Sequence, residues 1–167
     1  MSLAKNNIVL IGMPACGKST IGVQLAKWLS MGYIDTDLLV QARAGESMQA
    51  YQDRHGMDAY QTLECDTVKS VICDNCVIAT GGSAVYCGAA MEHLQSIARI
   101  VFLDVPVQEI KKRIGDISRR GVVIKPGMML DDLYVERHPL YKRYAEFVID
   151  CGGRPQDEIL SAIRALI

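Results

Sequence analysis

The chain has 167 residues, of which 50% are hydrophobic, and a formal net charge of −1. This length predicts one domain, spanning residues 1–167, with a full hydrophobic core. The near-neutral charge excludes a basic surface for nucleic acid or an anionic membrane, and no apolar run approaches the roughly 20 residues of a membrane span. Because Met1–Asn7 is too short and polar for a secretory leader, we expect a cytoplasmic protein. We also expect a monomer with no nucleic-acid or membrane partner.

Apolar runs and helical stripes alternate along the whole chain. In chain order they predict a strand over 7–12, a helix over 18–30, a strand over 33–35, helices over 36–44, 47–55 and 58–73, a strand over 76–80, a helix over 88–98, a strand over 99–104, a helix over 106–114, a loop over 115–128, a helix over 130–146, a strand over 147–150 and a helix over 155–166. This alternation predicts an α/β fold of three layers, in which helices cover both faces of a five-stranded parallel sheet.

The most specific motif lies between the first strand and the first helix. Residues 12–20 read Gly-Met-Pro-Ala-Cys-Gly-Lys-Ser-Thr, the G-x-x-x-x-G-K-[ST] phosphate-binding loop. Gly12 and Gly17 allow backbone angles that a side chain would forbid. The N–H groups of the loop can then converge on phosphate oxygens at a helix N-terminus. We expect Lys18 to reach the β- and γ-phosphates and the Ser19 hydroxyl to bind Mg²⁺.

Two carboxylates follow the second predicted strand. Asp35 and Asp37 are two residues apart, so on an extended backbone both side chains point to the same side. One carboxylate can hold Mg²⁺ and its waters, and the other can orient or deprotonate an acceptor hydroxyl. The alternative is that Asp37 or Thr36 only caps the following helix.

Glycines and arginines mark the rest of the candidate site. Gly81-Gly82 follows a buried strand and allows either close approach to a ligand or a tight turn. Arg113, Arg119 and Arg120 border the 115–128 loop, and we expect at least one of them to close over a transferring phosphoryl group as part of a lid.

Arg137 lies in a predicted helix next to Pro139 and can clamp a carboxylate or phosphate with its two-pronged guanidinium. The alternative is an ion pair with Glu136 or Glu146. The six cysteines are expected to be structural thiols, because Cys73-x-x-Cys76 lacks the second pair that a zinc site needs.

The order of these motifs resembles the shikimate kinases, a family of phosphate-loop kinases, over almost the whole chain. The resemblance implies transfer of the γ-phosphoryl group of ATP to a small hydroxy acid, with Mg²⁺ as cofactor. It implies catalytic roles for Lys18, Asp37 and Arg120, and metal binding by Ser19 and Asp35. It implies acceptor binding by Asp37, Gly81, Gly82 and Arg137, and nucleotide binding by Gly12, Ala15, Cys16, Gly17, Lys18, Ser19, Thr20, Arg113 and Arg154.

Three positions depart from the family pattern. The F-R-x-x-E segment, whose arginine is a second grip on the substrate carboxylate, reads Tyr60-Gln61-Thr62-Leu63-Glu64. Ser83 replaces the third glycine of the family's triplet, and Gly121 replaces a proline of the lid. Loss of one charged hydrogen bond predicts about 10–100-fold weaker binding of shikimate, unless Arg54 substitutes for the missing arginine.

We therefore expect a magnesium-dependent kinase that phosphorylates a hydroxyl of shikimate. A kinase of the same fold that acts on another hydroxy acid, such as homoserine or gluconate, is the first alternative, and Gln61 and Ser83 favour it. A nucleotide-binding regulator without phosphoryl transfer is the second.

Overall fold

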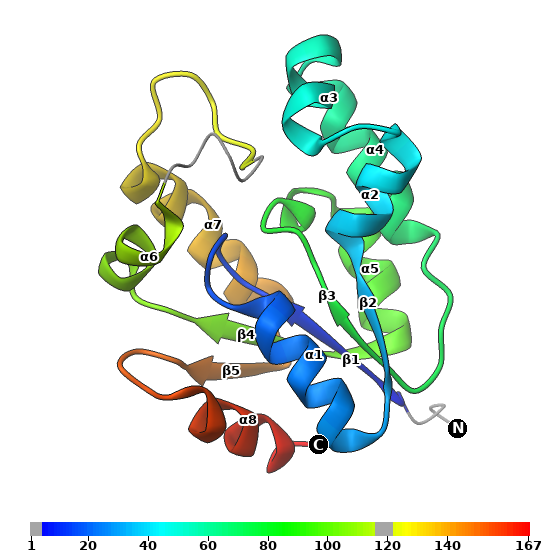
Figure 1. Ribbon diagram of the computed structural model, residues 1–167, viewed down its shortest axis with the longest axis vertical. Helices are drawn as coiled ribbons and strands as arrows, with labels where there is room; N and C mark the ends of the chain where they lie inside the picture. Colours follow the sequence, from blue (N-terminus) through cyan, green and yellow to red (C-terminus); the bar gives the residue numbers. More distant parts are fainter. Residues whose placement is uncertain (1–4, 116–121) are drawn as a thin grey trace.

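The computed structural model describes residues 5–115 and 122–167 (Figure 1). Within these ranges five strands form one sheet in the order β2-β3-β1-β4-β5. The strands are β1 (Asn7–Ile11), β2 (Gly32–Asp35), β3 (Cys76–Ala79), β4 (Ala98–Asp104) and β5 (Phe147–Asp150). Every neighbouring pair is parallel, which confirms the predicted α/β fold.

Helices cover both faces of this sheet. In Figure 1, α1 and α8 lie in front of it and α5 and α7 behind, while α2, α3 and the start of α4 stand beyond one end of the strands. The helices are α1 (Lys18–Leu29), α2 (Thr36–Ala44), α3 (Met48–His55), α4 (Met57–Lys69), α5 (Gly88–Ile97), α6 (Val107–Ile114), α7 (Leu130–Tyr144) and α8 (Gln156–Arg164), with a 3₁₀ turn η1 (Ala84–Tyr86) before α5.

The central strand β1 is buried at all five positions. Its apolar run is continuous because helices cover both faces of a parallel sheet, so no position is left to water. β1 pairs with β3 on one side and β4 on the other, with Ile8 opposite both Val77 and Arg99. The carboxyl ends of these strands meet at one edge, where ligands of open α/β sheets gather.

Two features of the elements differ from the predictions, the end of α4 and the turn η1. α4 ends at Lys69, four residues before the predicted Cys73, and the C-x-x-C segment therefore begins in the following loop and ends at Cys76, the first residue of β3. α7 continues through Pro139, although proline removes a backbone donor there. The turn η1 was not predicted, because three residues are too few to show a helical hydrophobic period. In the described part of the chain, no helix is long and apolar enough to cross a membrane.

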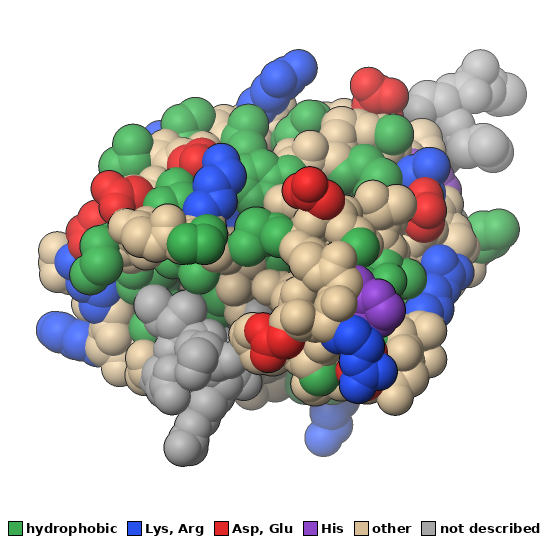
Figure 2. Space-filling model, turned by 90° about the horizontal axis from the view of Figure 1, so that it is seen from above, with side chains coloured by type: hydrophobic (Ala, Val, Ile, Leu, Met, Phe, Trp, Pro, Cys, Tyr) green, Lys and Arg blue, Asp and Glu red, His purple; other side chains and the backbone are tan. Residues whose placement is uncertain are grey.

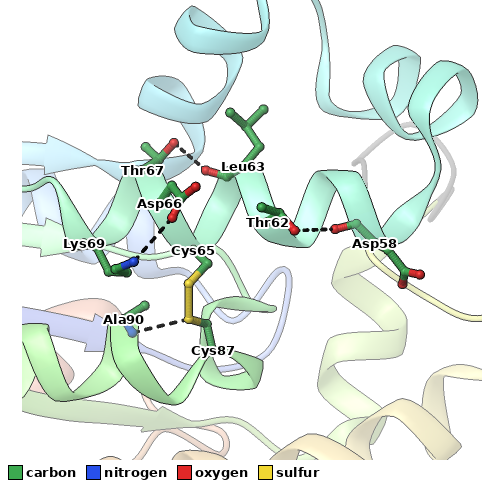
Figure 3. The surroundings of a disulfide bond; sticks show 9 residues. All are labelled: Asp58, Thr62, Leu63, Cys65, Asp66, Thr67, Lys69, Cys87 and Ala90. Atoms are coloured by element: carbon green, nitrogen blue, oxygen red, sulfur yellow. Dashed lines mark hydrogen bonds and ion pairs between the residues drawn. A yellow bond between two sulfur atoms is a disulfide. The ribbon is translucent and has the colours of Figure 1, made fainter.

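A disulfide joins α4 to the N-terminus of α5. Cys65 and Cys87 are bonded, with their Cα atoms 5.8 Å apart (Figure 3). Cys87 is also the N-cap of α5, and its sulfur accepts a hydrogen bond from the Ala90 N–H. The expectation of structural thiols is therefore wrong for these two cysteines, whereas the other four are free. The bond ties α4 to the segment that follows Gly81-Gly82.

Candidate functional site

The phosphate-binding loop connects β1 to α1 at the carboxyl edge of the sheet. Gly12 has φ +149°, and a Cβ there would lie 2.9 Å from the carbonyl oxygen of Leu103. Gly17, the N-cap of α1, has φ +103°. Both positions therefore require glycine, because their backbone angles disfavour a side chain. Gly12 requires it for a second reason, its close packing against β4.

Lys18 and Ser19 are already held in place by protein groups. The Lys18 side chain is buried, and its Nζ donates to the carbonyl oxygens of Gly12 and Met13, each at 2.8 Å. Ser19 Oγ donates to Asp35 Oδ2 at 2.7 Å, and the Tyr33 hydroxyl donates to the same oxygen at 3.2 Å. A hydroxyl and a carboxylate that meet in this way are oxygen ligands of the kind Mg²⁺ prefers, so these residues fit the expected metal.

A cavity of about 360 Å³ lies over the loop. Its walls are formed by Pro14, Ala15, Gly17, Lys18, Ser19, Thr20, Asp37, Thr80 and Arg113. Arg113 reaches it from α6 while also forming an ion pair with Glu109 at 2.9 Å. The structure thus gathers Asp37 and Arg113 around the loop, as the sequence predicted.

Two other predicted nucleotide residues lie differently. The Cys16 side chain is buried in the hydrophobic core, its sulfur accepts a hydrogen bond from Lys18 Nζ at 3.6 Å, and the residue does not line the cavity. Arg154 does not line the cavity; it donates to the Asp150 carbonyl at 3.1 Å and pairs with Glu158 at 3.5 Å. Arg119 and Arg120 lie outside the described residues, as does the part 116–121 of the predicted 115–128 lid.

Asp35, rather than Asp37 or Thr36, caps α2. Its Oδ1 accepts a hydrogen bond from the Asp37 N–H at 3.0 Å. The alternative that Asp37 or Thr36 serves as the cap is therefore wrong, and the Asp37 carboxylate is left for other contacts. Thr36 instead accepts a hydrogen bond from the Gly81 N–H at 3.2 Å, which joins the end of β2 to the end of β3.

The Asp37 carboxylate is buried beside the phosphate cavity. Burial raises its pKa to about 6, and the negative charge of Asp35 adds to this rise while Lys18 opposes it. The group is therefore mostly ionised at pH 7 and can accept a proton or a hydrogen bond from a hydroxyl.

Gly81 and Gly82 form a surface between Asp37 and Arg137. A Cβ on Gly81 would lie 2.5 Å from Asp37 Oδ1 and 2.5 Å from Glu64 Oε1. A Cβ on Gly82 would lie 3.0 Å from Arg137 Nη1. Any side chain at these positions would displace neighbouring groups, so the glycines allow Asp37, Glu64 and Arg137 to lie close to the backbone, and approach of a ligand stays a prediction.

Arg137 projects from α7 and is 1% exposed. Its Nε donates to the Tyr86 hydroxyl at 3.0 Å, its Nη2 donates to the Val123 carbonyl, and its guanidinium lies 4.9 Å from the centre of the Tyr86 ring. Among the described residues no carboxylate pairs with it. Glu136 instead accepts from Tyr86 at 2.5 Å, so the predicted ion-pair alternative for Arg137 is wrong.

Glu64 is a site residue to which the sequence assigned no role. It is 2% exposed; its Oε2 accepts from Ser83 Oγ at 2.6 Å, whereas Oε1 has no hydrogen-bond partner within 5–115 and 122–167. Burial raises its pKa to about 7. Its position was a usable signal, because Tyr60, Glu64 and Thr67 share the buried face of α4 at helical spacing.

Gln61 lines a second cavity, of about 180 Å³, next to Tyr86 and Val123. Arg54, the expected substitute for the missing arginine, pairs with Glu46 at 3.4 Å, with 69% of its side chain exposed. It lines neither cavity. The second charge at the carboxylate-binding end is therefore not replaced by Arg54.

A parallel sheet with this loop, an acidic pair and a buried arginine at one edge defines a phosphate-loop kinase. The family model for shikimate kinase matches residues 14–167. The chain belongs to the shikimate kinase family, whose members are ATP-dependent phosphotransferases that act on a hydroxyl group.

The chain is similar to individual shikimate kinases over nearly their full length. The chain is 36% identical to a shikimate kinase of Clostridium botulinum over 98% of both chains, and 30% identical to one of Francisella tularensis subsp. holarctica, covering 96% of this chain and 94% of that one. Among solved structures, the shikimate kinase of Acinetobacter baumannii in complex with shikimate matches with a TM-score of 0.85 and 27% identity, over 96% of this chain and 91% of that one. The Aquifex aeolicus enzyme matches with a TM-score of 0.82 and 29% identity, over 95% and 94%.

Proposed function

We propose that this protein transfers the γ-phosphoryl group of ATP to a hydroxyl of shikimate. The position of Asp37 carries this proposal: its carboxylate lines the cavity of the phosphate-binding loop and also approaches Gly81, on the side of Arg137. One carboxylate is thus within reach of both reactants. The A. baumannii relative, which holds shikimate, supports the choice of acceptor.

The nucleotide would lie on the loop. Lys18 would exchange its two carbonyl partners for phosphate oxygens, while the backbone of Gly12, Ala15, Cys16, Gly17 and Thr20 would surround the phosphates. Ser19 and Asp35 would hold Mg²⁺, which when bound neutralises negative charge on the phosphate oxygens. Arg113 lines this cavity and would contact the nucleotide directly. Arg154 would need to leave Glu158 to do so.

Asp37 would accept the hydrogen of the acceptor hydroxyl and hold that oxygen in line with the γ-phosphorus. Phosphoryl transfer passes through a loose transition state, so this positioning contributes more than strong base catalysis. The hydroxyl oxygen bonds to phosphorus, the bond to the β–γ bridging oxygen breaks, and ADP leaves with that oxygen. The hydroxyl proton passes to Asp37 and then to solvent.

Arg137 would bind the carboxylate of the acceptor. Its Nη2 donates to the Val123 carbonyl and its Nη1 lies beside Gly82, so Nη1 would be the group that faces the acceptor. The role of Arg120 in a closing lid stays a prediction from the family resemblance. Closure there would exclude water, so that the acceptor hydroxyl rather than water is phosphorylated.

The test is a coupled assay of ADP release with a panel of acceptors. Shikimate, homoserine, gluconate and a reaction without acceptor are compared at saturating ATP and Mg²⁺. We expect acceptor-dependent ADP release with shikimate. Robust turnover of another acid with none of shikimate would contradict the choice of acceptor, and ATP binding without any transfer would favour a nucleotide-binding regulator.

A kinase for another hydroxy acid is the second candidate. Two observations favour it. The neutral Gln61 leaves Arg137 without a second cationic partner from α4. Ser83 replaces a glycine of the family pattern, and its hydroxyl donates a hydrogen bond to Glu64. Both observations concern the acceptor end and leave the proposed phosphoryl transfer unaffected.

A further inference from the structure

Glu64 has an oxygen that no group of the described residues satisfies. Its Oε2 is held by Ser83, but Oε1 is fully buried and has no hydrogen-bond partner. A buried acceptor without a donor is unfavourable, and more so when the group is ionised. A ligand that brings a donor to this oxygen would therefore gain affinity.

This oxygen lies at the acceptor end of the site. Glu64 Oε1 and Asp37 Oδ1 are each 2.5 Å from the point that a Gly81 Cβ would occupy, so the two oxygens are separated by no more than twice that distance. The charged groups that act on Glu64 are Asp37, Arg137 and Lys18. Lys18 is held by loop carbonyls on the nucleotide side, which leaves two carboxylates and Arg137 around the acceptor.

The family resemblance explains why this oxygen is unpaired. An arginine is expected at position 61, one turn before Glu64 on α4, and this chain has the neutral Gln61. Residues three apart on a helix are neighbours, so an arginine there would lie near the glutamate. Its loss makes the acceptor end one unit more negative than the family pattern implies. An acceptor that carries one additional positive charge would compensate.

We propose that this site also phosphorylates hydroxy acids that carry an ammonium group, with the ammonium bound by Glu64 Oε1. The carboxylate of such a zwitterion would lie on Arg137, and its hydroxyl would lie on Asp37. The inference rests on the proposed phosphoryl transfer and adds a substrate class to it. Bond making and breaking are the same as for shikimate: the hydroxyl oxygen bonds to the γ-phosphorus, ADP leaves, and the proton passes to Asp37.

The first test uses the unmodified protein and two acceptors that differ by one group. Homoserine and 4-hydroxybutyrate have the same carbon chain, carboxylate and terminal hydroxyl, but only homoserine has the ammonium. One hydrogen bond to a charged group predicts a kcat/KM for homoserine about 10–100-fold above that for 4-hydroxybutyrate. Equal values, or turnover of shikimate without any of homoserine, would overturn the inference.

The second test assigns the preference to Glu64. Glu64→Gln keeps the size of the side chain and an amide that can bond Ser83, but removes the charge. We expect it to lower kcat/KM for homoserine by about 10-fold or more while 4-hydroxybutyrate and shikimate lose little. Asp66→Asn, which removes an exposed acidic group from the same helix, is the matched control and should leave the preference unchanged. An equal loss on all acceptors in Glu64→Gln would show a merely structural role and overturn the inference.

Binding gives a readout without turnover. Calorimetric titration of homoserine into the protein with ADP and Mg²⁺ should show about 10-fold weaker affinity for Glu64→Gln than for the unmodified chain. Unchanged affinity would overturn the inference even if activity falls. Absence of phosphoryl transfer to every acceptor, shikimate included, would instead contradict the proposed function, so the two failures are distinguishable.

Discussion

The two ends of the candidate site differ in how ready they are for a ligand. At the nucleotide end, Lys18 and Ser19 are held by protein groups and line an open cavity. At the acceptor end, Nε and Nη2 of Arg137 donate to Tyr86 and Val123, and the residue is 1% exposed. A ligand at the first end would replace the two carbonyl contacts of Lys18 beside a cavity that is already open, whereas the second end must first become accessible.

This difference follows from the range of the contacts that build each end. The Lys18 contacts span five and six residues, within a single loop. Those of Arg137 reach 51 residues to Tyr86 and 14 to Val123, and Gly81 bonds Thr36 across 45 residues. A short loop is fixed by its own backbone angles, while an end assembled from distant segments can change its specificity through single substitutions such as those at positions 61 and 83.

The largest expected effect tests the nucleotide end. Lys18→Ala should lower kcat by about 10³-fold, because it removes a preorganised positive charge that would stabilise the transferring phosphoryl group. Lys27→Ala, an exposed lysine of the same helix, is the control and should retain full activity. Steady-state ADP release measures both. A loss below 10-fold in Lys18→Ala would mean that the phosphates do not lie on this loop.

Local patterns explain which parts of the molecule could be predicted from the sequence. The loop and the five strands are encoded within a few residues each, and the positions of the strands are confirmed. Asp37, expected on an extended backbone with Asp35, instead lies in the first turn of α2. The role of Asp35 as helix cap was missed, because both aspartates suit an N-cap and spacing alone does not choose between them. The end of α4 was missed because no glycine or proline marks Lys69.

Contacts between distant segments could not be predicted in this way. Nothing near Arg137 in the sequence indicates that Tyr86 and the Val123 carbonyl take its donors, and an adjacent glutamate was the reasonable alternative. The Cys65–Cys87 disulfide likewise depends on how α4 and α5 lie together. Glu64 is intermediate: its place on the apolar face of α4 was visible, but the missing partner of Oε1 was not.

The second prediction concerns stability at the acceptor end. Burial raises the pKa of Glu64 from 4.5 to about 7, so the folded chain keeps a proton that the unfolded chain releases. The proton on Glu64 therefore contributes fully to the free energy of unfolding below pH 4.5, and this contribution is lost as the pH rises through 7. Relative to the unmodified chain, Glu64→Gln should gain about 2–3 kcal/mol of unfolding free energy between pH 5 and pH 8.

Urea denaturation at the two pH values measures this change. Asp37 titrates in both proteins, so its contribution cancels to first order. A constant difference between the two proteins at pH 5 and pH 8 would contradict a buried, proton-binding Glu64.

The third prediction tests the buried arginine. Arg137→Lys keeps the charge but loses the two-pronged geometry, so KM for an acidic acceptor should rise about 30-fold while KM for ATP stays unchanged. Arg143→Lys, at an exposed position of the same helix, is the control. An equal rise of both KM values would place Arg137 in the fold rather than at the acceptor.

The smallest expected effect sharpens the contrast between the two ends. Gln61→Arg restores the charge that the family pattern has, one helical turn before Glu64 on α4 and at the wall of the smaller cavity. KM for shikimate should fall about 10-fold, by one charged hydrogen bond, while kcat and KM for ATP stay the same. Thr62→Arg adds the same charge at an exposed neighbouring position and controls for general attraction of an anion. A fall of KM in both variants would indicate long-range attraction, and an unchanged KM in Gln61→Arg would show that the shikimate carboxylate does not lie near α4. A fall of KM in Gln61→Arg alone would instead show that one neutral side chain, Gln61, lowers the affinity of this chain for an anionic acceptor. That side chain lies at the end of the site that distant segments assemble.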